Sequence, residues 1–132
     1  MHFLLEGLSY RAAPLAVRER VVIPDESLRR WLVRLSDQPH VRGGAILSTC
    51  NRTEIYAWVD DASTSIDAFT EAIDPMGEWP KYHYRLKGAD ALEHLFLVAS
   101  GIDSAILGEG QILGQFKAAH RVSREAGAMD PE

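Results

Sequence analysis

The chain has 132 residues, 46% of them hydrophobic and 25% charged, a composition typical of one globular domain with a single core. Its net charge of −5 excludes a domain that binds nucleic acid through a broad basic surface, although local arginine clusters could supply a few phosphate contacts. No apolar run reaches the length of a membrane span, and the N-terminus lacks the pattern of a signal peptide, so we expect a cytoplasmic protein.

The first third of the chain is predicted to hold one strand and two helices. Residues 2–8 are short and apolar, which is typical of a strand. A proline suited to the first helical turn precedes a short helix over residues 15–20. A second helix is expected over residues 25–36, because leucine and tryptophan recur there at helical spacing and Pro39 follows.

The middle of the chain is predicted to form a hairpin. Two glycines precede residues 45–47, which are typical of a buried strand, and residues 53–59 are rich in β-formers and predict its partner. The connection between them is Ser48-Thr49-Cys50-Asn51-Arg52. The one cysteine of the chain is therefore expected in a turn between two strands.

The remaining elements complete an α+β fold. We expect a helix over residues 62–73, a loop at 76–80, a strand at 82–86, a helix over 89–99 and a final long helix from residue 109. The order is β-α-β-β-α-β with extra helices. It predicts a ferredoxin-like sandwich, in which one antiparallel sheet carries its helices on a single face.

Two kinds of cofactor site are excluded by spacing. One cysteine and scattered histidines do not give the ligand pattern of a metal centre, so no metal is expected. The glycines of residues 108–114 follow GxGxxxG, with no clear strand before them and no ribose-binding acid after them. That stretch is therefore not interpreted as a dinucleotide site.

The residues around Cys50 suit a thiol that attacks an anionic substrate. A thiol attacks as its thiolate, which nearby positive charge and inward-pointing backbone N–H groups stabilise. Arg52 supplies a fixed charge and a fork suited to a carboxylate, and Thr49 and Asn51 add short hydrogen-bonding groups. Spacing alone leaves an equal alternative, in which Thr49 and Asn51 are ordinary turn residues and Arg52 faces solvent.

Three stretches carry a family resemblance, in one order along the chain. They are GLSY at 7–10 with Ala13-Pro14 and VRER at 17–20; STCNRTEIY at 48–56; and HLF at 94–96, VASGIDS at 98–104, LGE at 107–109 and QILGQ at 111–115. Together they resemble the signature segments of the glutamyl-tRNA reductases, which begin tetrapyrrole (porphyrin) synthesis from glutamate by the C5 route. The resemblance spans nearly the whole chain.

The resemblance implies an NADPH-dependent oxidoreductase that acts on an aminoacyl-tRNA in two stages. Cys50 would attack the ester that joins glutamate to its tRNA and form a thioester. Hydride from NADPH would then release glutamate-1-semialdehyde. Splitting one difficult step into two easier ones is ordinary covalent catalysis.

The resemblance also implies roles for individual residues. Thr49, Asn51 and Arg52 would line the glutamate pocket, with Arg52 holding the side-chain carboxylate. His94 matches a histidine that the family needs for activity; without the resemblance it is better interpreted as a packed histidine on an apolar helix. The other implied substrate-binding residues are Ser104, Glu109, Gly110, Gln111 and Gln115.

The implied domains and partners follow from the same resemblance. Residues 1–108 would form the catalytic, glutamyl-tRNA-binding core, and residues 109–132 the helix that completes the pocket and begins the family's spinal helix. The family's NADPH-binding and dimerisation domains are not recognisable, so the chain alone is expected to form and hydrolyse the thioester at most. Expected partners are glutamyl-tRNA(Glu) and glutamate-1-semialdehyde aminomutase. The full-length family is homodimeric, and this chain is expected to be a monomer or weak dimer.

Two alternative functions would use the same residues. One is a stand-alone thiol-dependent glutamyl esterase or acyltransferase that needs no nicotinamide partner. The other is a non-catalytic module that binds glutamyl-tRNA or a partner protein. Intact Cys50, Arg52 and His94 count against the second alternative, because a binding-only descendant is free to lose them.

Overall fold

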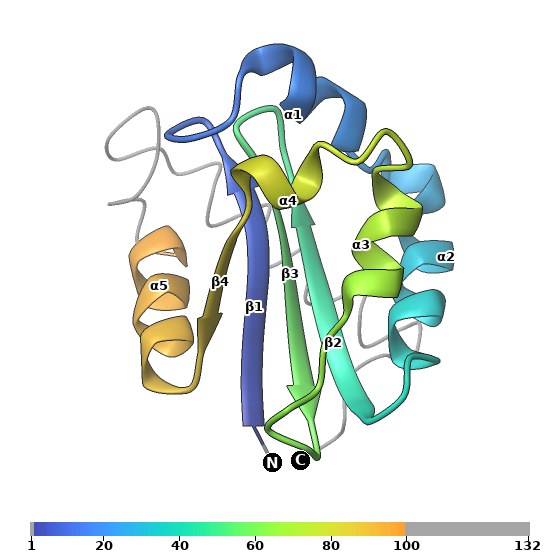
Figure 1. The fold of residues 1–132 in the computed structure, drawn as a ribbon, viewed down its shortest axis with the longest axis vertical. Helices are drawn as coiled ribbons and strands as arrows, with labels where there is room; N and C mark the ends of the chain where they lie inside the picture. The colour runs from blue at the N-terminus through green and yellow to red at the C-terminus, as the bar shows by residue number, and fades with distance from the viewer. Residues whose placement is uncertain (1, 100–132) are drawn as a thin grey trace.

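The computed structural model describes residues 2–99, which fold around a four-stranded antiparallel sheet (Figure 1). The strands are β1 (His2–Ser9), β2 (Val41–Ser48), β3 (Arg52–Val59) and β4 (Tyr84–Lys87). They lie in the order β2-β3-β1-β4, and each neighbouring pair is antiparallel. Helices follow β1 and β3, so the order β-α-β-β-α-β confirms the predicted ferredoxin-like α+β sandwich.

The helices are α1 (Leu15–Val21), α2 (Asp25–Ser36), α3 (Asp67–Ile73), α4 (Trp79–Tyr82) and α5 (Ala89–Ala99). Helix α2 forms where the leucine spacing predicts it, and its three leucines are buried on one side. Asp25 and Glu26 in its first turn favour the helix through the helix dipole. Within residues 2–99, no helix is long and apolar enough to cross a membrane.

Strand β3 shows how the sheet divides its side chains between two cores. Ile55, Ala57 and Val59 pack in the core that contains the buried residues of α1, α2 and α3. Tyr56 and Trp58 point the other way, into a second core with α5. This alternation is the period of two that a strand imposes.

Helix α5 lies on the opposite face of the sheet from α1, α2 and α3, so the prediction of helices on a single face is wrong for α5. Its Ala91 and Val98 are buried in the second core together with Phe3 and Leu5 of β1. The physical reason is that β1 is apolar on both faces, and both faces therefore need cover. Gly88, at φ 59°, makes the turn from β4 into α5.

The segment between β3 and β4 also differs from the prediction. Helix α3 begins at Asp67 rather than at residue 62, and the expected loop at 76–80 contains the start of α4. Trp79 anchors that short helix, because its side chain is 2% exposed and its backbone N–H donates to Asp74 Oδ2 at 2.7 Å. The glycine and proline of this segment indicated a loop, but burial of Trp79 and the hydrogen bond of its N–H group stabilise a short helix there.

Strand β2 begins at Val41, earlier than the predicted residue 45, and includes the two glycines that were interpreted as punctuation. A Cβ on Gly44 would lie 2.6 Å from Leu35 Cδ2 and 2.7 Å from the Tyr56 carbonyl oxygen. Gly44 therefore lets α2 pack closely against the strand.

Strand β4 begins at Tyr84 rather than at residue 82. The final helix expected from residue 109, and with it the division between 1–108 and 109–132, lies outside the described residues.

Candidate functional site

Cys50 lies in the tight connection between β2 and β3, residues 49–51, which confirms its predicted place in a turn between two strands. The residue is exposed. Two hydrogen-bonding groups of Thr49 close this turn. Its backbone N–H donates to the Arg52 carbonyl at 2.7 Å, and its hydroxyl oxygen accepts the N–H groups of Asn51 and Arg52 at 3.1 and 3.2 Å. Such local hydroxyl-to-backbone bonds explain why a threonine suits this position.

Two neighbouring segments hold the turn from outside. Arg18 of α1 donates from Nη1 to the Cys50 carbonyl at 3.0 Å and from Nε to the Ala13 carbonyl at 3.1 Å. On the other side, the Tyr10 N–H donates to the Asn51 carbonyl at 2.8 Å. The thiol is therefore presented to solvent from a backbone that is fixed at both of these carbonyls.

Arg52 is buried, which contradicts the alternative that it faces solvent. Its Nη1 lies 3.5 Å from Glu54 Oε2, and its Cζ lies 6.0 Å from the centre of the Tyr10 ring. A buried guanidinium is costly unless carboxylates or aromatic faces stabilise it. The contacts with Glu54 and Tyr10 supply both kinds of stabilisation.

Glu54 is the centre of a buried polar cluster beneath α5. Its Oε1 accepts the Tyr56 hydroxyl at 2.5 Å. Its Oε2 accepts the Tyr84 hydroxyl and His94 Nε2, the latter at 2.5 Å, and it also faces Arg52. The Tyr84 and His94 rings also pack together, with their centres 5.3 Å apart. Side chains from β3, β4 and α5 thus converge on one carboxylate that is fully buried.

Gly7 makes room for this convergence. It lies on β1, which runs between β3 and β4, and it is paired with Glu54 of β3 and with Tyr84 of β4. A Cβ at Gly7 would lie 2.8 Å from the Tyr84 hydroxyl oxygen and 2.9 Å from Glu54 Cγ. The two side chains can therefore meet across β1 because the strand has no side chain at that point.

The charge of the cluster follows from its hydrogen bonds. Burial acts to raise the pKa of Glu54, but the hydrogen bond and positive charge of His94 and the two tyrosine hydroxyls outweigh it, and that pKa is lowered. Burial, followed by the charge of Glu54, raises the pKa of Tyr56 well above its ordinary value. Glu54 is therefore a carboxylate at neutral pH, and Tyr56 stays a hydrogen-bond donor.

A second buried carboxylate, Glu6, lies on the opposite face of the sheet. Its oxygens accept Trp79 Nε1 at 3.4 Å and Arg85 Nε at 3.1 Å, beside a hollow of about 530 Å³. Burial is the main reason why the pKa of Glu6 is raised. The two carboxylates thus share the sheet but have opposite pKa shifts.

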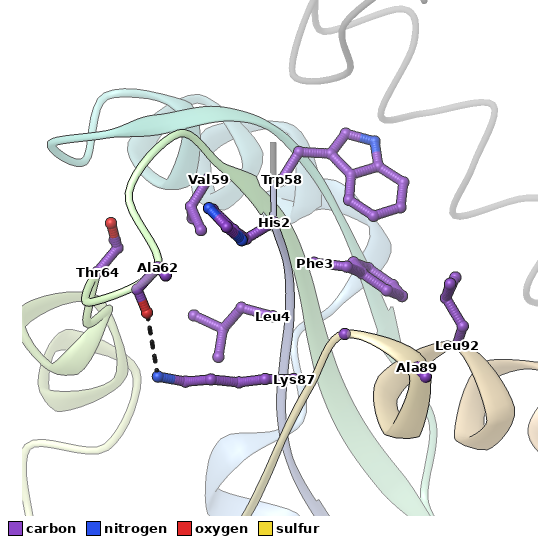
Figure 2. Close-up of a pocket in the computed structure, with 11 residues that line it drawn as sticks. His2, Phe3, Leu4, Trp58, Val59, Ala62, Thr64, Lys87, Ala89 and Leu92 are labelled. Atoms are coloured by element: carbon purple, nitrogen blue, oxygen red, sulfur yellow. Dashed lines mark hydrogen bonds between the residues drawn. The ribbon is translucent and has the colours of Figure 1, made fainter.

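A larger hollow, about 770 Å³, lies at the far end of the sheet from Cys50 (Figure 2). Apolar side chains line most of it, and the Lys87 amine donates to the Ala62 carbonyl at its edge. The register of β1 fixes this separation, because His2 pairs with Val59 whereas Ser9 pairs with Arg52. The hollow is therefore separate from the thiol turn.

The predicted site residues that the structure describes gather in one region. Thr49, Cys50, Asn51 and Arg52 form the turn and the start of β3, and His94 reaches the same carboxylate as Arg52. The other predicted residues, Ser104, Glu109, Gly110, Gln111 and Gln115, lie outside the described residues. Within residues 2–99, no group of three or more His, Cys, Asp or Glu side chains could hold a metal ion.

The sequence reasoning missed Glu54 and its tyrosine partners as site residues. A signal was available within STCNRTEIY, where Arg52, Glu54 and Tyr56 recur with period two and so share one face of the predicted strand. An arginine and a glutamate in that pattern, on a strand otherwise rich in apolar residues, indicate a buried polar pair.

Comparisons with known proteins identify the family of the chain. Residues 7–132 match the family model described as glutamyl-tRNA(Glu) reductase, N-terminal domain. The chain is 40% identical to a glutamyl-tRNA reductase of Gloeothece citriformis over 98% of its own length and 31% of that protein. It is 46% identical to one of Xanthomonas campestris over 93% of its length and 28% of that protein.

A solved structure gives the same answer for the fold. The glutamyl-tRNA reductase from Methanopyrus kandleri superposes with a TM-score of 0.74 at 28% identity, over 98% of this chain and 30% of that one. The chain thus spans about a third of the relatives that it matches. It belongs to the glutamyl-tRNA reductase family, to the part that corresponds to the family's N-terminal domain.

Proposed function

We propose that this chain carries the acyl-accepting thiol site of an NADPH-dependent glutamyl-tRNA reductase. The observation that carries the proposal is the exposed Cys50 on a turn whose backbone carbonyl is bound by Arg18. The next residue after this turn is the buried Arg52, which contacts the same carboxylate, that of Glu54, as His94 does. The names of the relatives give the same substrate and reaction class. In the proposed enzyme, glutamyl-tRNA(Glu) is the substrate and glutamate-1-semialdehyde aminomutase receives the product.

The first half of the reaction is an acyl transfer. Cys50 Sγ forms a bond to the glutamyl carbonyl carbon and the ester C–O bond to the tRNA ribose breaks. The thiol proton ends on the ribosyl oxygen that leaves. In this scheme Thr49 and Asn51 border the reacting carbonyl, and Arg52 attracts the side-chain carboxylate of the glutamyl group.

The proposed substrate pocket extends beyond the turn. Ser104, Glu109, Gly110, Gln111 and Gln115 are proposed to contact the glutamyl-tRNA on the basis of the family resemblance. The second half of the reaction is the reduction of the thioester, for which NADPH supplies the hydride. The antiparallel sheet of residues 2–99 offers no glycine-rich turn between a strand and a helix for a dinucleotide, so these residues do not fit the nicotinamide cofactor.

The test is transfer of labelled glutamate from charged tRNA to the protein without NADPH. The chain should acquire label that thiol reagents release, and a Cys50→Ser variant should acquire none. A Cys50→Ser chain that labels equally would place the acyl group elsewhere. Label that stays on the tRNA at the uncatalysed rate would contradict the proposal and favour a binding role.

A further inference from the structure

The carboxylate of Glu54 connects Arg52, at the start of β3, with His94 on α5. One oxygen of this carboxylate faces both His94 Nε2, at 2.5 Å, and Arg52 Nη1, at 3.5 Å. Arg52 lies two residues after Cys50, and its backbone N–H and carbonyl both bind Thr49 within the thiol turn. A displacement of the carboxylate would therefore disturb both the histidine and the strand that begins at the turn.

The chemistry of a carboxylate decides which nitrogen of His94 carries hydrogen. An ionised carboxylate can only accept, so the Nε2 atom that contacts it must be the donor. Hydrogen bonds from His94, Tyr56 and Tyr84 favour the ionised carboxylate, although burial acts against ionisation. In the neutral ring the basic lone pair then lies on Nδ1, as in other sites where a carboxylate orients a histidine.

We propose that Glu54 is a positioning residue of the thiol site, which holds His94 as the Nε2–H tautomer and orients Arg52 next to the thiol turn. The proposal rests on the proposed function.

Tyr56 and Tyr84 support this role from two strands. Each hydroxyl donates to Glu54, one to each oxygen, and together with His94 they fix the carboxylate in one orientation. A glutamine at position 54 would present one acceptor and one NH₂ donor to the same surrounding donors. The environment is therefore matched to a carboxylate rather than to a neutral group of the same shape.

The first experiment measures the tautomer of His94 in the unaltered chain. Long-range ¹H–¹⁵N NMR correlations of ¹⁵N-histidine-labelled protein distinguish the two neutral forms, with a His94→Gln variant for assignment. We expect Nε2–H as the single neutral form. A ring that carries its hydrogen on Nδ1 would overturn the proposal.

The second experiment compares Glu54→Gln with Glu6→Gln, a matched change of a buried carboxylate on the opposite face. The Glu54→Gln chain should lose the single Nε2–H form and transfer glutamate to Cys50 about 10- to 100-fold more slowly, because His94 and Arg52 lose the carboxylate that orients them. The Glu6→Gln chain should keep the tautomer and transfer within about twofold of the unaltered rate. Unchanged transfer in Glu54→Gln, or an equal loss in Glu6→Gln, would overturn the proposal.

The two proposals fail in different ways. If the proposed function is wrong, the unaltered chain does not label at Cys50, while the tautomer of His94 still tests the role of Glu54. If Glu54→Gln does not fold, the tautomer measurement needs no substitution at position 54 and decides the question. If label transfer is normal but the tautomer is Nδ1–H, the positioning role of Glu54 fails and the proposed function stands.

Discussion

At Gly7 a single missing side chain permits the contact between two strands that are not neighbours. The carboxylate of Glu54 on β3 and the hydroxyl of Tyr84 on β4 meet across β1 at this residue. Gly7 falls within the first predicted strand, residues 2–8, and a glycine within a strand pattern can indicate a close approach of this kind. Its partners could not be predicted, because residues 7, 54, 84 and 94 come together only through the pairing of the strands.

A Gly7→Ala substitution should therefore destabilise the fold and the thiol site together. The new methyl group would meet Tyr84 and Glu54 at less than 3 Å, so at least one of the two side chains must shift and the geometry of their hydrogen bond must change. Overpacking of this kind costs about 1–3 kcal/mol, which urea unfolding would measure. Gly77→Asn is the control, because Gly77 is at φ 74° with no atom within 4 Å of a Cβ, and asparagine tolerates that conformation. Equal stability of the Gly7→Ala and unaltered chains would contradict the packing described for Gly7.

At the scale of elements, helix α1 matters because it holds the thiol turn rather than because of its own stability. Arg18 is half-buried and connects the residues before the helix to the Cys50 carbonyl. The position of the cysteine turn was predictable, since β-formers on both sides of a short polar segment indicate a hairpin. The hydrogen bond from Arg18 to the Cys50 carbonyl was not predictable, because it joins residues 32 positions apart.

An Arg18→Ala substitution should slow acyl transfer to Cys50 by about tenfold, because the reacting atom is less well positioned. The free energy of unfolding should change by less than about 1 kcal/mol. Arg20→Ala is a matched control on the same helix, because the Arg20 side chain donates to the Ala16 carbonyl of its own turn. Faster amide hydrogen exchange at Thr49 would be a second readout. If the Arg18→Ala and Arg20→Ala chains show the same amide exchange at Thr49 and the same rate of acyl transfer, the hydrogen bond from Arg18 to the Cys50 carbonyl has no effect on the site.

The elements themselves were largely predictable, and the exceptions have physical causes. The periodicity of α2 and the β-formers of β3 predicted both correctly. The side on which α5 packs was not predictable, because β1 is apolar on both faces and offers a core to either side. Helix α4 was missed because the burial of Trp79 depends on tertiary contacts that a local pattern does not contain.

At the scale of the whole molecule, the sheet separates two buried carboxylates that respond to pH in opposite directions. The pKa of Glu54 lies below its ordinary value of 4.5 in the folded chain. Its contribution to stability is therefore complete above that ordinary value and is lost as the pH falls through the lower folded value. The pKa of Glu6 is raised, so stability is lost as the pH rises from its ordinary value through the raised one.

The pH dependence of unfolding should therefore differ between the two glutamine variants. Glu54→Gln should flatten the loss of stability on acidification below about pH 4.5, and Glu6→Gln should flatten the loss on the alkaline side of that value. Urea unfolding across about pH 3 to 8 would measure both curves against the unaltered chain. Curves that run parallel for all three proteins would contradict the two pKa shifts.

The antiparallel register of β1 has a practical consequence for work with the protein. The strand places His2 and Ser9 at its two ends, and Ser9 pairs with the first residue of β3 beside the thiol turn. At about 3.4 Å per residue, roughly 24 Å of strand separates the exposed His2 from that turn. A surface tether or a fluorescent dye attached at His2 would therefore leave the thiol open to a substrate as bulky as a charged tRNA.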